Sequence, residues 1–519
     1  MKKTKRSLTL SLLLVLMLSL LITSCSTGPA TTTSTPSAES NVSQETSQEE
    51  EFVLFSNLPE VDYTGETFKV IVEGDFRTTY MSVEFLPQET SYDTLKMAVG
   101  ERNDLITEKF GIEFEEFRTT SDGQMVTDLT ANAVAGISEY DMVMPFMSDA
   151  ATLALEGYFF DLNDKSLAGM ENIHLDMPYY DQGSVRDLSV ANKNYFVTGD
   201  LSLLALACTH AIIFNKDVIG ERGLENPYDL VNDGKWTIDK MLEMCRGITA
   251  DDDGTPGFGY TDSYGFLVND NFVNSLYIGA GQRFTTKNNN DEPIIAVDSE
   301  SAARVYDKIY SFVTDTTAVC QFSAANNGYN TTSAAAGKNI WVAALESIES
   351  KKALFRAMAI IDIFDQGDYE CDFGVLPAPK LDEAQESYYN RVSTVYATCV
   401  AIPKNVRDPE MSAIITDALM QASTETTKRA YFQTIMQDRK VQDTESEEML
   451  QLIFDSRVYD LASIYHWGGS NEADLNSISG FMNAIAISGT NTFTSQWQAI
   501  ESSVKADMED TLDAYYNND

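Results

Sequence analysis

The chain has 519 residues, of which 43% are hydrophobic, so it is long enough for two or three globular domains with large cores. Its formal net charge of −43 would be repelled by phosphate backbones, so nucleic acid is not an expected partner. The six cysteines are widely spaced and form no C-x-x-C pair, which indicates buried thiols rather than a disulfide scaffold.

The N-terminus has the organisation of an export signal. Basic residues at Lys2–Arg6 precede an uncharged, Leu-rich run from Leu8 to Ile22, which is short for a membrane span of about 20 residues. The run ends in Ile22-Thr23-Ser24-Cys25, which resembles the lipobox of bacterial lipoproteins. There the chain is cut just before the cysteine, and the cysteine is acylated. We therefore predict a signal peptide at 1–24 and a lipid on Cys25, with an uncleaved anchor as the alternative.

Residues 25–51 carry almost no apolar side chains and are rich in Ser, Thr and Glu. Such a segment cannot bury enough surface to offset its ordering entropy. It is expected to be a disordered tether, with the fold starting near Phe52.

Strand and helix patterns alternate in the first part of the fold. β-branched residues, helical spacing, and Gly or Pro stops give the following expected elements: a strand at 67–73, a helix over 95–110 ending at Gly111, a strand at 112–117, a helix at 125–134 and a strand at 140–145. This order predicts an α/β layer with a parallel sheet.

Later helices are marked by their caps. Thr237 precedes one helix, and Asp408-Pro409 precedes another. Near the C-terminus, apolar residues from Trp497 to Leu512 recur at helical spacing. Trp236 and Trp497 are therefore expected in the core.

No pattern in the chain indicates catalysis. The three histidines have no metal-ligand spacing, and neither a G-x-S-x-G elbow nor a Walker motif occurs. A non-enzyme without a cofactor is favoured. Asp251, Asp253 and Asp262 could ligate Ca²⁺ through oxygen, but the EF-hand spacing is not met. An acidic, Gly-rich turn is the favoured interpretation of this segment, and no metal site is predicted.

Five segments, taken together and in this order, resemble the extracellular solute-binding proteins of sugar-uptake ABC transporters, the family that includes maltose-binding protein. These segments are Glu139–Asp164, Asn194–Ile219 with its Ile-Phe-Asn-Lys motif, Gly223–Met241, Asp372–Glu383 and Cys399–Met420. The resemblance implies a periplasmic-binding-protein-like fold of type II, in which crossover strands join two α/β lobes around a ligand cleft.

The matching segments place the crossovers near Gly199, Ala343 and Ala401. Lobe 1 is then expected to hold 52–198 and 346–400, and lobe 2 to hold 199–345 and 401–519.

Candidate cleft residues come from two arguments. Loops beyond the carboxyl ends of strands, which the resemblance also indicates, nominate Asp75, Phe76, Phe146 and Asp200. Sugar binding needs flat aromatic rings for the C–H faces and polar groups for the hydroxyl rims. The aromatic candidates are Tyr80, Tyr264, Trp341 and Trp467, the last because no helical period explains it in its turn-like segment.

The resemblance implies a lipid-anchored, monomeric receptor on the outer face of the cell membrane, as in Gram-positive bacteria. It would capture a carbohydrate, such as an oligosaccharide, by hinge closure and deliver it to an ABC permease. The alternatives are a secreted carbohydrate-active enzyme and a surface adhesin or sensor accessory.

Overall fold

The computed structural model describes residues 53–518, apart from 75, 77–78, 90, 256, 366–370, 439–442 and 472–473. The predicted signal peptide, Cys25, the tether and Asp75 lie outside the described residues. None of the described helices is long and apolar enough to cross a membrane.

The first lobe is built on a three-stranded parallel sheet with the order β2-β1-β3. β1 (Thr67–Val72) pairs with β2 (Glu113–Arg118) on one side and with β3 (Met142–Met144) on the other. The connecting helices are α1 (Asp93–Phe110) and α2 (Gln124–Ala135). α1 ends at Gly111, which has a φ of 71° and donates its N–H to Thr107 O. The predicted alternation of strands and helices is confirmed.

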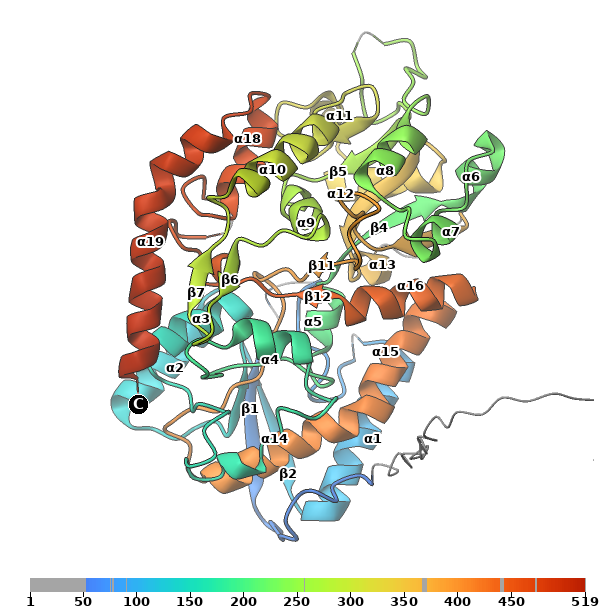
Figure 1. The fold of residues 1–519 in the computed structure, drawn as a ribbon. Helices are drawn as coiled ribbons and strands as arrows, with labels where there is room; N and C mark the ends of the chain where they lie inside the picture. The colour runs from blue at the N-terminus through green and yellow to red at the C-terminus, as the bar shows by residue number, and fades with distance from the viewer. Residues whose placement is uncertain are drawn as a thin grey trace, which may run out of the picture. The chain divides into compact units, whose positions relative to one another are not determined.

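The second lobe contains a five-stranded sheet with the order β10-β4-β9-β5-β8. Its strands are β4 (His210–Asn215), β5 (Tyr264–Val268), β8 (Val319–Gln321), β9 (Ala353–Ala359) and β10 (Phe373–Leu376). Strands β4 and β5 are labelled in Figure 1. β4 runs antiparallel to both of its neighbours, whereas β9, β5 and β8 are parallel. β9 is central and apolar in most positions, as expected for a strand covered on both faces.

Helices flank this second sheet and a small ribbon extends from it. The helices are α6 (Lys216–Arg222), α7 (Pro227–Asn232), α8 (Ile238–Cys245), α9 (Phe272–Gly279), α10 (Glu300–Val313), α11 (Gly328–Ala335), α12 (Ile340–Glu349) and α13 (Asp362–Asp365). Thr237 caps α8 as predicted, because its hydroxyl accepts from Lys240 N–H. The ribbon pairs β6 (Thr285–Lys287) with β7 (Pro293–Ile295). Trp236 is fully buried, as predicted.

The remaining elements belong to the crossovers and the C-terminal part. They are α3 (Met147–Leu155), η1 (Met170–Asn172), α4 (Gln182–Leu188), α5 (Leu203–Ala207), β11 (Asn390–Arg391), α14 (Pro409–Ser423), η2 (Thr424–Lys428), α15 (Arg429–Gln433), η3 (Thr434–Asp438), α16 (Thr444–Asp455), β12 (Arg457–Val458), α17 (Leu461–Ile464), α18 (Gly480–Ser488) and α19 (Phe493–Asn517). β11 and β12 form a parallel pair. η2 and η3 are π-helical turns, a form that is rare and often found at functional sites.

Strand pairing places several segments differently from the predicted lobe boundaries. β9 and β10 fall within 346–400, which was assigned to lobe 1, yet they hydrogen-bond to β4 in the second sheet. Ala343 lies inside α12 rather than in a crossover. Val400 and Ala401 bridge Val197 and Val143 at the first lobe.

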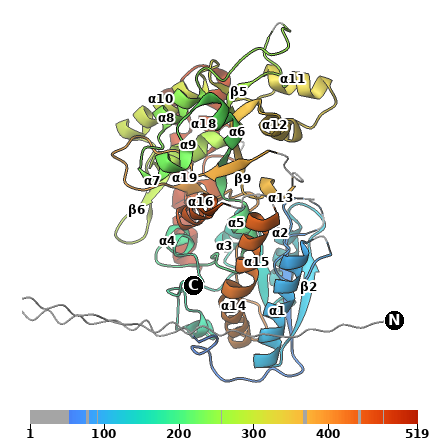
Figure 2. The same cartoon turned by 90° about the vertical axis from the view of Figure 1, so that its right-hand side faces the viewer.

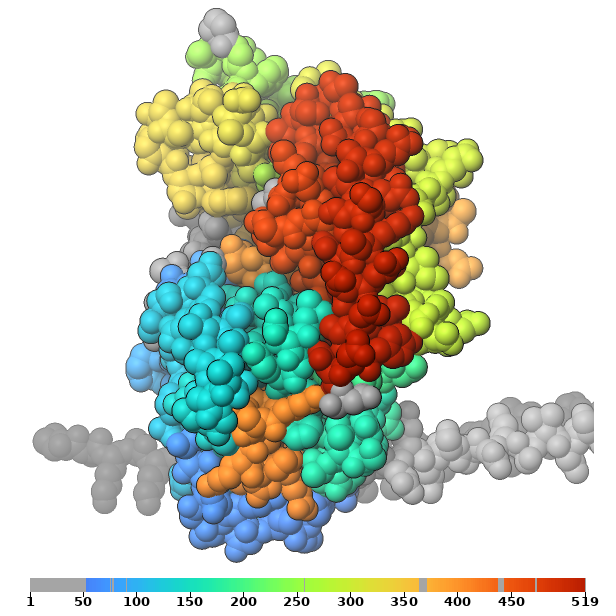
Figure 3. Space-filling model, turned by 90° about the vertical axis from the view of Figure 1, so that its left-hand side faces the viewer, coloured from blue at the N-terminus to red at the C-terminus, as the bar shows by residue number. Residues whose placement is uncertain are grey.

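Two C-terminal helices pack on the first lobe. α14 lies beside α1 (Figure 2). Asp408 caps it by accepting from Met411 N–H, as predicted from the sequence. α19 reaches α3, and the space-filling view shows this red C-terminal segment against the teal one (Figure 3). Trp497 is buried on the apolar stripe of α19, as predicted.

Candidate functional site

A cavity of about 870 Å³ lies where strands of both lobes end. Thr79 and Tyr80 follow β1, and Asp122 follows β2. On the second lobe, Asn269 directly follows β5 and Asp362 closely follows β9. Loops beyond the carboxyl ends of parallel strands are where open α/β sheets bind ligands. This cavity is therefore the candidate functional site.

An aromatic pair forms the wall of the cavity on the first lobe. The rings of Tyr80 and Tyr396 are stacked, with centroids 4.2 Å apart and planes inclined by 21°. Phe146 meets Tyr396 edge-on at 5.9 Å, and Phe76 meets Phe146 edge-on at 6.5 Å. Phe76 and Phe146 do not line the cavity. Phe146 supports the ring of Tyr396, which does line it, and Phe76 packs on Phe146. The result is a flat aromatic surface with an apolar backing.

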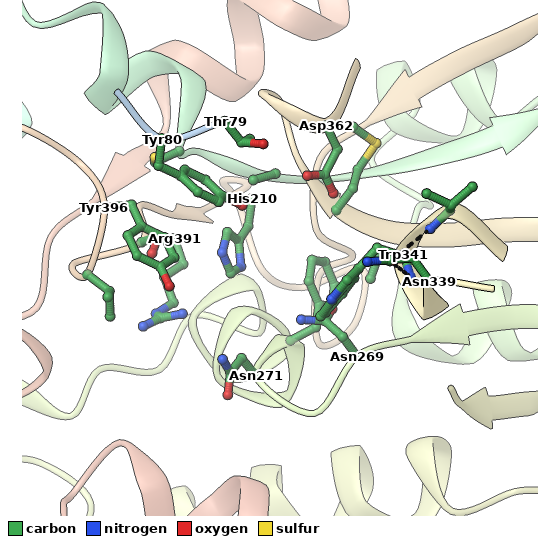
Figure 4. Close-up of a pocket in the computed structure, with 18 of the residues that line it drawn as sticks. Thr79, Tyr80, His210, Asn269, Asn271, Asn339, Trp341, Asp362, Arg391 and Tyr396 are labelled. Atoms are coloured by element: carbon green, nitrogen blue, oxygen red, sulfur yellow. Dashed lines mark hydrogen bonds between the residues drawn. The ribbon is translucent and has the colours of Figure 1, made fainter. Parts of the chain in front are cut away.

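Trp341 forms the facing wall, at the start of α12 (Figure 4). Asn339 caps this helix, because its side-chain oxygen accepts from Trp341 N–H at 2.9 Å. The indole stands edge-on to Phe322, with centroids 5.2 Å apart, and 41% of Trp341 is exposed. The cap and the ring contact hold a large aromatic surface open to the cavity.

His210 lies between the two walls, and Arg391 lies next to Tyr396 (Figure 4). His210 Nδ1 is 2.5 Å from Ser275 Oγ, and its ring stacks on Phe272. Burial and, secondarily, the nearby Arg391 cation lower the pKa of His210 to about 3. The imidazole is therefore neutral at physiological pH and acts as a hydrogen-bonding group rather than a charge.

Asp362 supplies a carboxylate on the same side as Trp341 (Figure 4). Its side chain is 17% exposed, and its Oδ2 lies 3.5 Å from Nη2 of the fully buried Arg356. Burial raises the pKa of the Asp362 carboxyl, and the Arg356 cation opposes that rise.

Three of the proposed cleft residues lie away from the cavity. Tyr264 is the first residue of β5 and is buried, with its hydroxyl donating to Gly259 O. Trp467 is 1% exposed and donates from Nε1 to Thr511 Oγ1 at 2.9 Å, which makes it a core residue. Asp200 is buried and accepts from Lys428 Nζ at 2.7 Å and from Thr424 Oγ1. Of the aromatic candidates, Tyr80 and Trp341 line the cavity.

Asp200 belongs to a charged network where the chain passes between lobes. Lys428, in the π-helical turn η2, pairs with it. Nearby, Arg457 in β12 pairs with Asp181 at 2.7 Å, and Tyr459 donates its hydroxyl to the same carboxylate. The network ties the first crossover to the segments that return later in the chain.

The sequence contained a usable signal for several lining residues that were missed. Polar residues at or soon after the ends of apolar strands, such as Asn269 and Asp362, occupy the position that the strand-end rule favours. Tyr396 and Arg391 carried no such signal, because they come from a crossover and from a two-residue strand.

One acidic cluster could hold a metal ion among the described residues, and it does not line the cavity. It consists of Asp251, Asp253 and Asp262. Asp262 already accepts backbone N–H groups from Asp252 and Gly259, at 2.9 and 2.7 Å, so it closes the turn.

Comparison with solved structures shows the fold. The cyclic α-maltosyl-1,6-maltose binding protein from Arthrobacter globiformis matches with a TM-score of 0.53 at 12% identity, covering 85% of this chain and 99% of that one. A cyclo/maltodextrin-binding protein complexed with maltotetraose matches at 0.50 and 12%, covering 86% and 96%. UgpB from Mycobacterium tuberculosis, in complex with glycerophosphocholine, matches at 0.50 and 14%, covering 86% and 99%. The predicted type II fold of two α/β lobes around a cleft is confirmed.

No curated protein matches the chain. The model of the bacterial extracellular solute-binding protein family matches residues 87–410, which is more than half of the chain. With the two lobes and the cavity at their strand ends, this match shows that the chain belongs to the bacterial extracellular solute-binding protein family.

Proposed function

We propose that this solute-binding protein captures a carbohydrate in the cavity and delivers it to an ABC permease. The observation that carries the proposal is the pair of aromatic walls, Tyr80 with Tyr396 on one lobe and Trp341 on the other. Sugar rings present C–H faces that pack on flat aromatic rings. A ligand held between these walls would contact both lobes.

The polar lining suits the hydroxyl rim of a sugar. Asparagine amides, which both donate and accept, lie at Asn269, Asn271, Asn339 and Asn471. The charged lining residues among those described are Asp122, Asp362 and Arg391, so no single sign of charge dominates. Two of the three structural neighbours are described as binding maltose-derived oligosaccharides, and the third holds glycerophosphocholine. A neutral oligosaccharide is the ligand that this lining favours.

Capture would proceed by closure of the lobes. A ligand that bridges both walls stabilises the closed state by its greater affinity for that state. The protein would then act without catalysis, at the outer face of the membrane, held there by a lipid on Cys25 and the tether at 25–51.

The test is a thermal-shift screen of residues 26–519 with maltotetraose, cyclic α-maltosyl-1,6-maltose and glycerophosphocholine, followed by calorimetry. An oligosaccharide at 100 times its Kd should add about 2.7 kcal/mol to the free energy of unfolding. Trp341→Ala should weaken its binding about tenfold or more, because an aromatic face and its buried area are lost.

Phe258→Ala is the matched control, because Phe258 is 46% exposed and does not line the cavity. It should bind like the wild type. Binding of neither oligosaccharide, or equal affinity in Trp341→Ala, would contradict the proposal.

A further inference from the structure

An arginine lies in the core of the second sheet with few partners. Arg356 is on the central strand β9, opposite Ile213 of β4 and Leu267 of β5, and it is 0% exposed. Among the described residues, the one polar contact of its side chain joins Nη2 to Asp362 Oδ2 at 3.5 Å, which is long for a hydrogen bond. Within the described residues, its Nε and Nη1 have no hydrogen-bond partner.

Arg102, in the first lobe, shows how a buried arginine is normally satisfied. It is also 0% exposed, yet Nε donates to Asn103 Oδ1 at 3.0 Å, Nη1 to Glu84 O at 2.6 Å and Nη2 to Phe85 O at 2.7 Å. Burying a cation without such partners is unfavourable, and apolar residues at buried ion-pair positions are often as stable or more so. Stability alone therefore does not account for Arg356.

The carboxylate next to Arg356 lines the cavity. Building on the carbohydrate-binding function, we propose that Arg356 is a positioning residue. It holds Asp362 as a carboxylate at the cavity wall, where Asp362 accepts hydrogen bonds from ligand hydroxyl groups. A charged acceptor beside Trp341 favours a ligand that presents O–H donors there, and it disfavours one that presents a phosphate or carboxylate.

The other titratable groups around the cavity allow this role to be isolated by pH. Cys208 and His210 line the same cavity. Burial raises the pKa of the Cys208 thiol well above its usual range, and His210 titrates at about 3, so neither changes charge between pH 5 and 8. Arg391 also lines the cavity, and it is retained in every variant. Asp122, from the first lobe, is retained in every variant. Its contribution to stability and affinity therefore cancels when a variant is compared with wild type.

Two arms test the proposal, one of them without ligand. In the first, the free energy of unfolding of wild type and Arg356→Met is measured from pH 4 to pH 8. Removing the cation raises the folded-state pKa of Asp362, so the variant should lose stability relative to wild type as pH rises through that pKa. Identical pH profiles would overturn the proposal.

The second arm measures affinity for maltotetraose and cyclic α-maltosyl-1,6-maltose by calorimetry. Asp362→Asn should weaken binding about 10- to 100-fold, the effect of losing a charged acceptor. Arg356→Met should weaken it about tenfold at pH 7 and progressively more as the pH is lowered to 5, since protonated Asp362 accepts poorly. Arg356→Lys keeps the charge and should stay within about threefold of wild type.

The controls separate the possible failures. Arg102→Met should lose stability with an unchanged pH profile of affinity. Asp362→Asn leaves Arg356 as an uncompensated buried charge, so if it does not fold, the double variant Asp362→Asn with Arg356→Met replaces it. Absence of oligosaccharide binding by wild type contradicts the proposed function and, with it, this role. If wild type binds oligosaccharide and Asp362→Asn, or the double variant, binds it with the same affinity, this inference alone is overturned. An equal loss of affinity in Arg356→Lys and Asp362→Asn would overturn it as well.

Discussion

Trp341 and Trp467 differ in what their indole groups contact. Trp341 is 41% exposed and stands edge-on to one ring, Phe322. Trp467 is 1% exposed, lies nearly parallel to Tyr465 at 6.3 Å and donates to Thr511. The first indole is available to a ligand, whereas the second holds α19 to the preceding turn.

Trp467→Ala should therefore lower the free energy of unfolding by about 3–5 kcal/mol, because it leaves a cavity in the core and removes the Nε1–H group that donates to the Thr511 oxygen. The folded variant should bind oligosaccharides as wild type does, since Trp467 does not line the cavity. Urea unfolding and calorimetry measure the two quantities. Trp341→Ala should show the reverse pattern, and weakened binding at unchanged stability in Trp467→Ala would contradict this assignment.

At the scale of single elements, α14 is buried on all sides. Asp417, at its centre, accepts from the hydroxyls of Tyr179 and Tyr180, each at 3.0 Å, and faces His174 Nδ1 at 3.1 Å. Gln421, one turn later, donates to Asp417 and accepts from Phe55 N–H. One carboxylate thus joins α14 to the segment before α4, and its neighbour secures the start of the fold.

His174→Gln tests this junction through pH. The hydrogen bond to Asp417 raises the pKa of His174, and burial opposes it. The pair therefore stabilises the fold fully below the unfolded-state pKa of about 6.5 and loses that contribution as pH rises through the folded-state pKa. The free energy of unfolding of wild type should exceed that of the variant by about 1 kcal/mol at pH 5.5 and by less at pH 8.5.

Unfolding in urea at several pH values measures this difference. Taking the difference matters because His210, whose pKa is lowered to about 3, contributes a slope of opposite sign in both proteins. A difference that is constant with pH would show that the imidazolium of His174 does not pair with Asp417.

Local signals predicted single elements well and their pairing less well. Gly111, Thr237 and Asp408 each end or cap a helix as expected, because capping depends on neighbouring residues. β9 was assigned to the wrong lobe because its partners β4 and β5 are set by contacts between distant segments. Local patterns contain no record of such pairing.

The site shows the same limit. In β5 the proposed residue was Tyr264, at the start of the strand, whereas Asn269, just past its end, lines the cavity. The two positions are about 16 Å apart along an extended chain. An aromatic residue at the start of β5 thus lies in the core, whereas the polar residue beyond its carboxyl end reaches the cavity.

At the scale of the whole molecule, the proposed anchor at Cys25 determines where the binding protein works. Under this proposal, the lipid retains the protein at the membrane. Stable anchoring requires two or more acyl chains, since each buried CH₂ contributes about 0.8 kcal/mol.

Cys25→Ala should abolish acylation and cleavage before residue 25, because the acceptor thiol is gone. Mass spectrometry of the N-terminal peptide and fractionation of cells into membrane and medium measure both effects. Ser26→Ala, one residue later, is the control and should be processed normally. A Cys25→Ala protein that is cleaved and retained like wild type would contradict the anchor.

The described cysteines are expected to react slowly with thiol reagents. Cys208, Cys245, Cys320, Cys371 and Cys399 are buried, and burial raises the pKa of each thiol. Because the thiolate is the reactive form, maleimide dyes should leave the folded protein almost unmodified. One cysteine introduced on the surface of each lobe would therefore take up fluorophores selectively, and energy transfer between them could follow the opening and closing of single molecules.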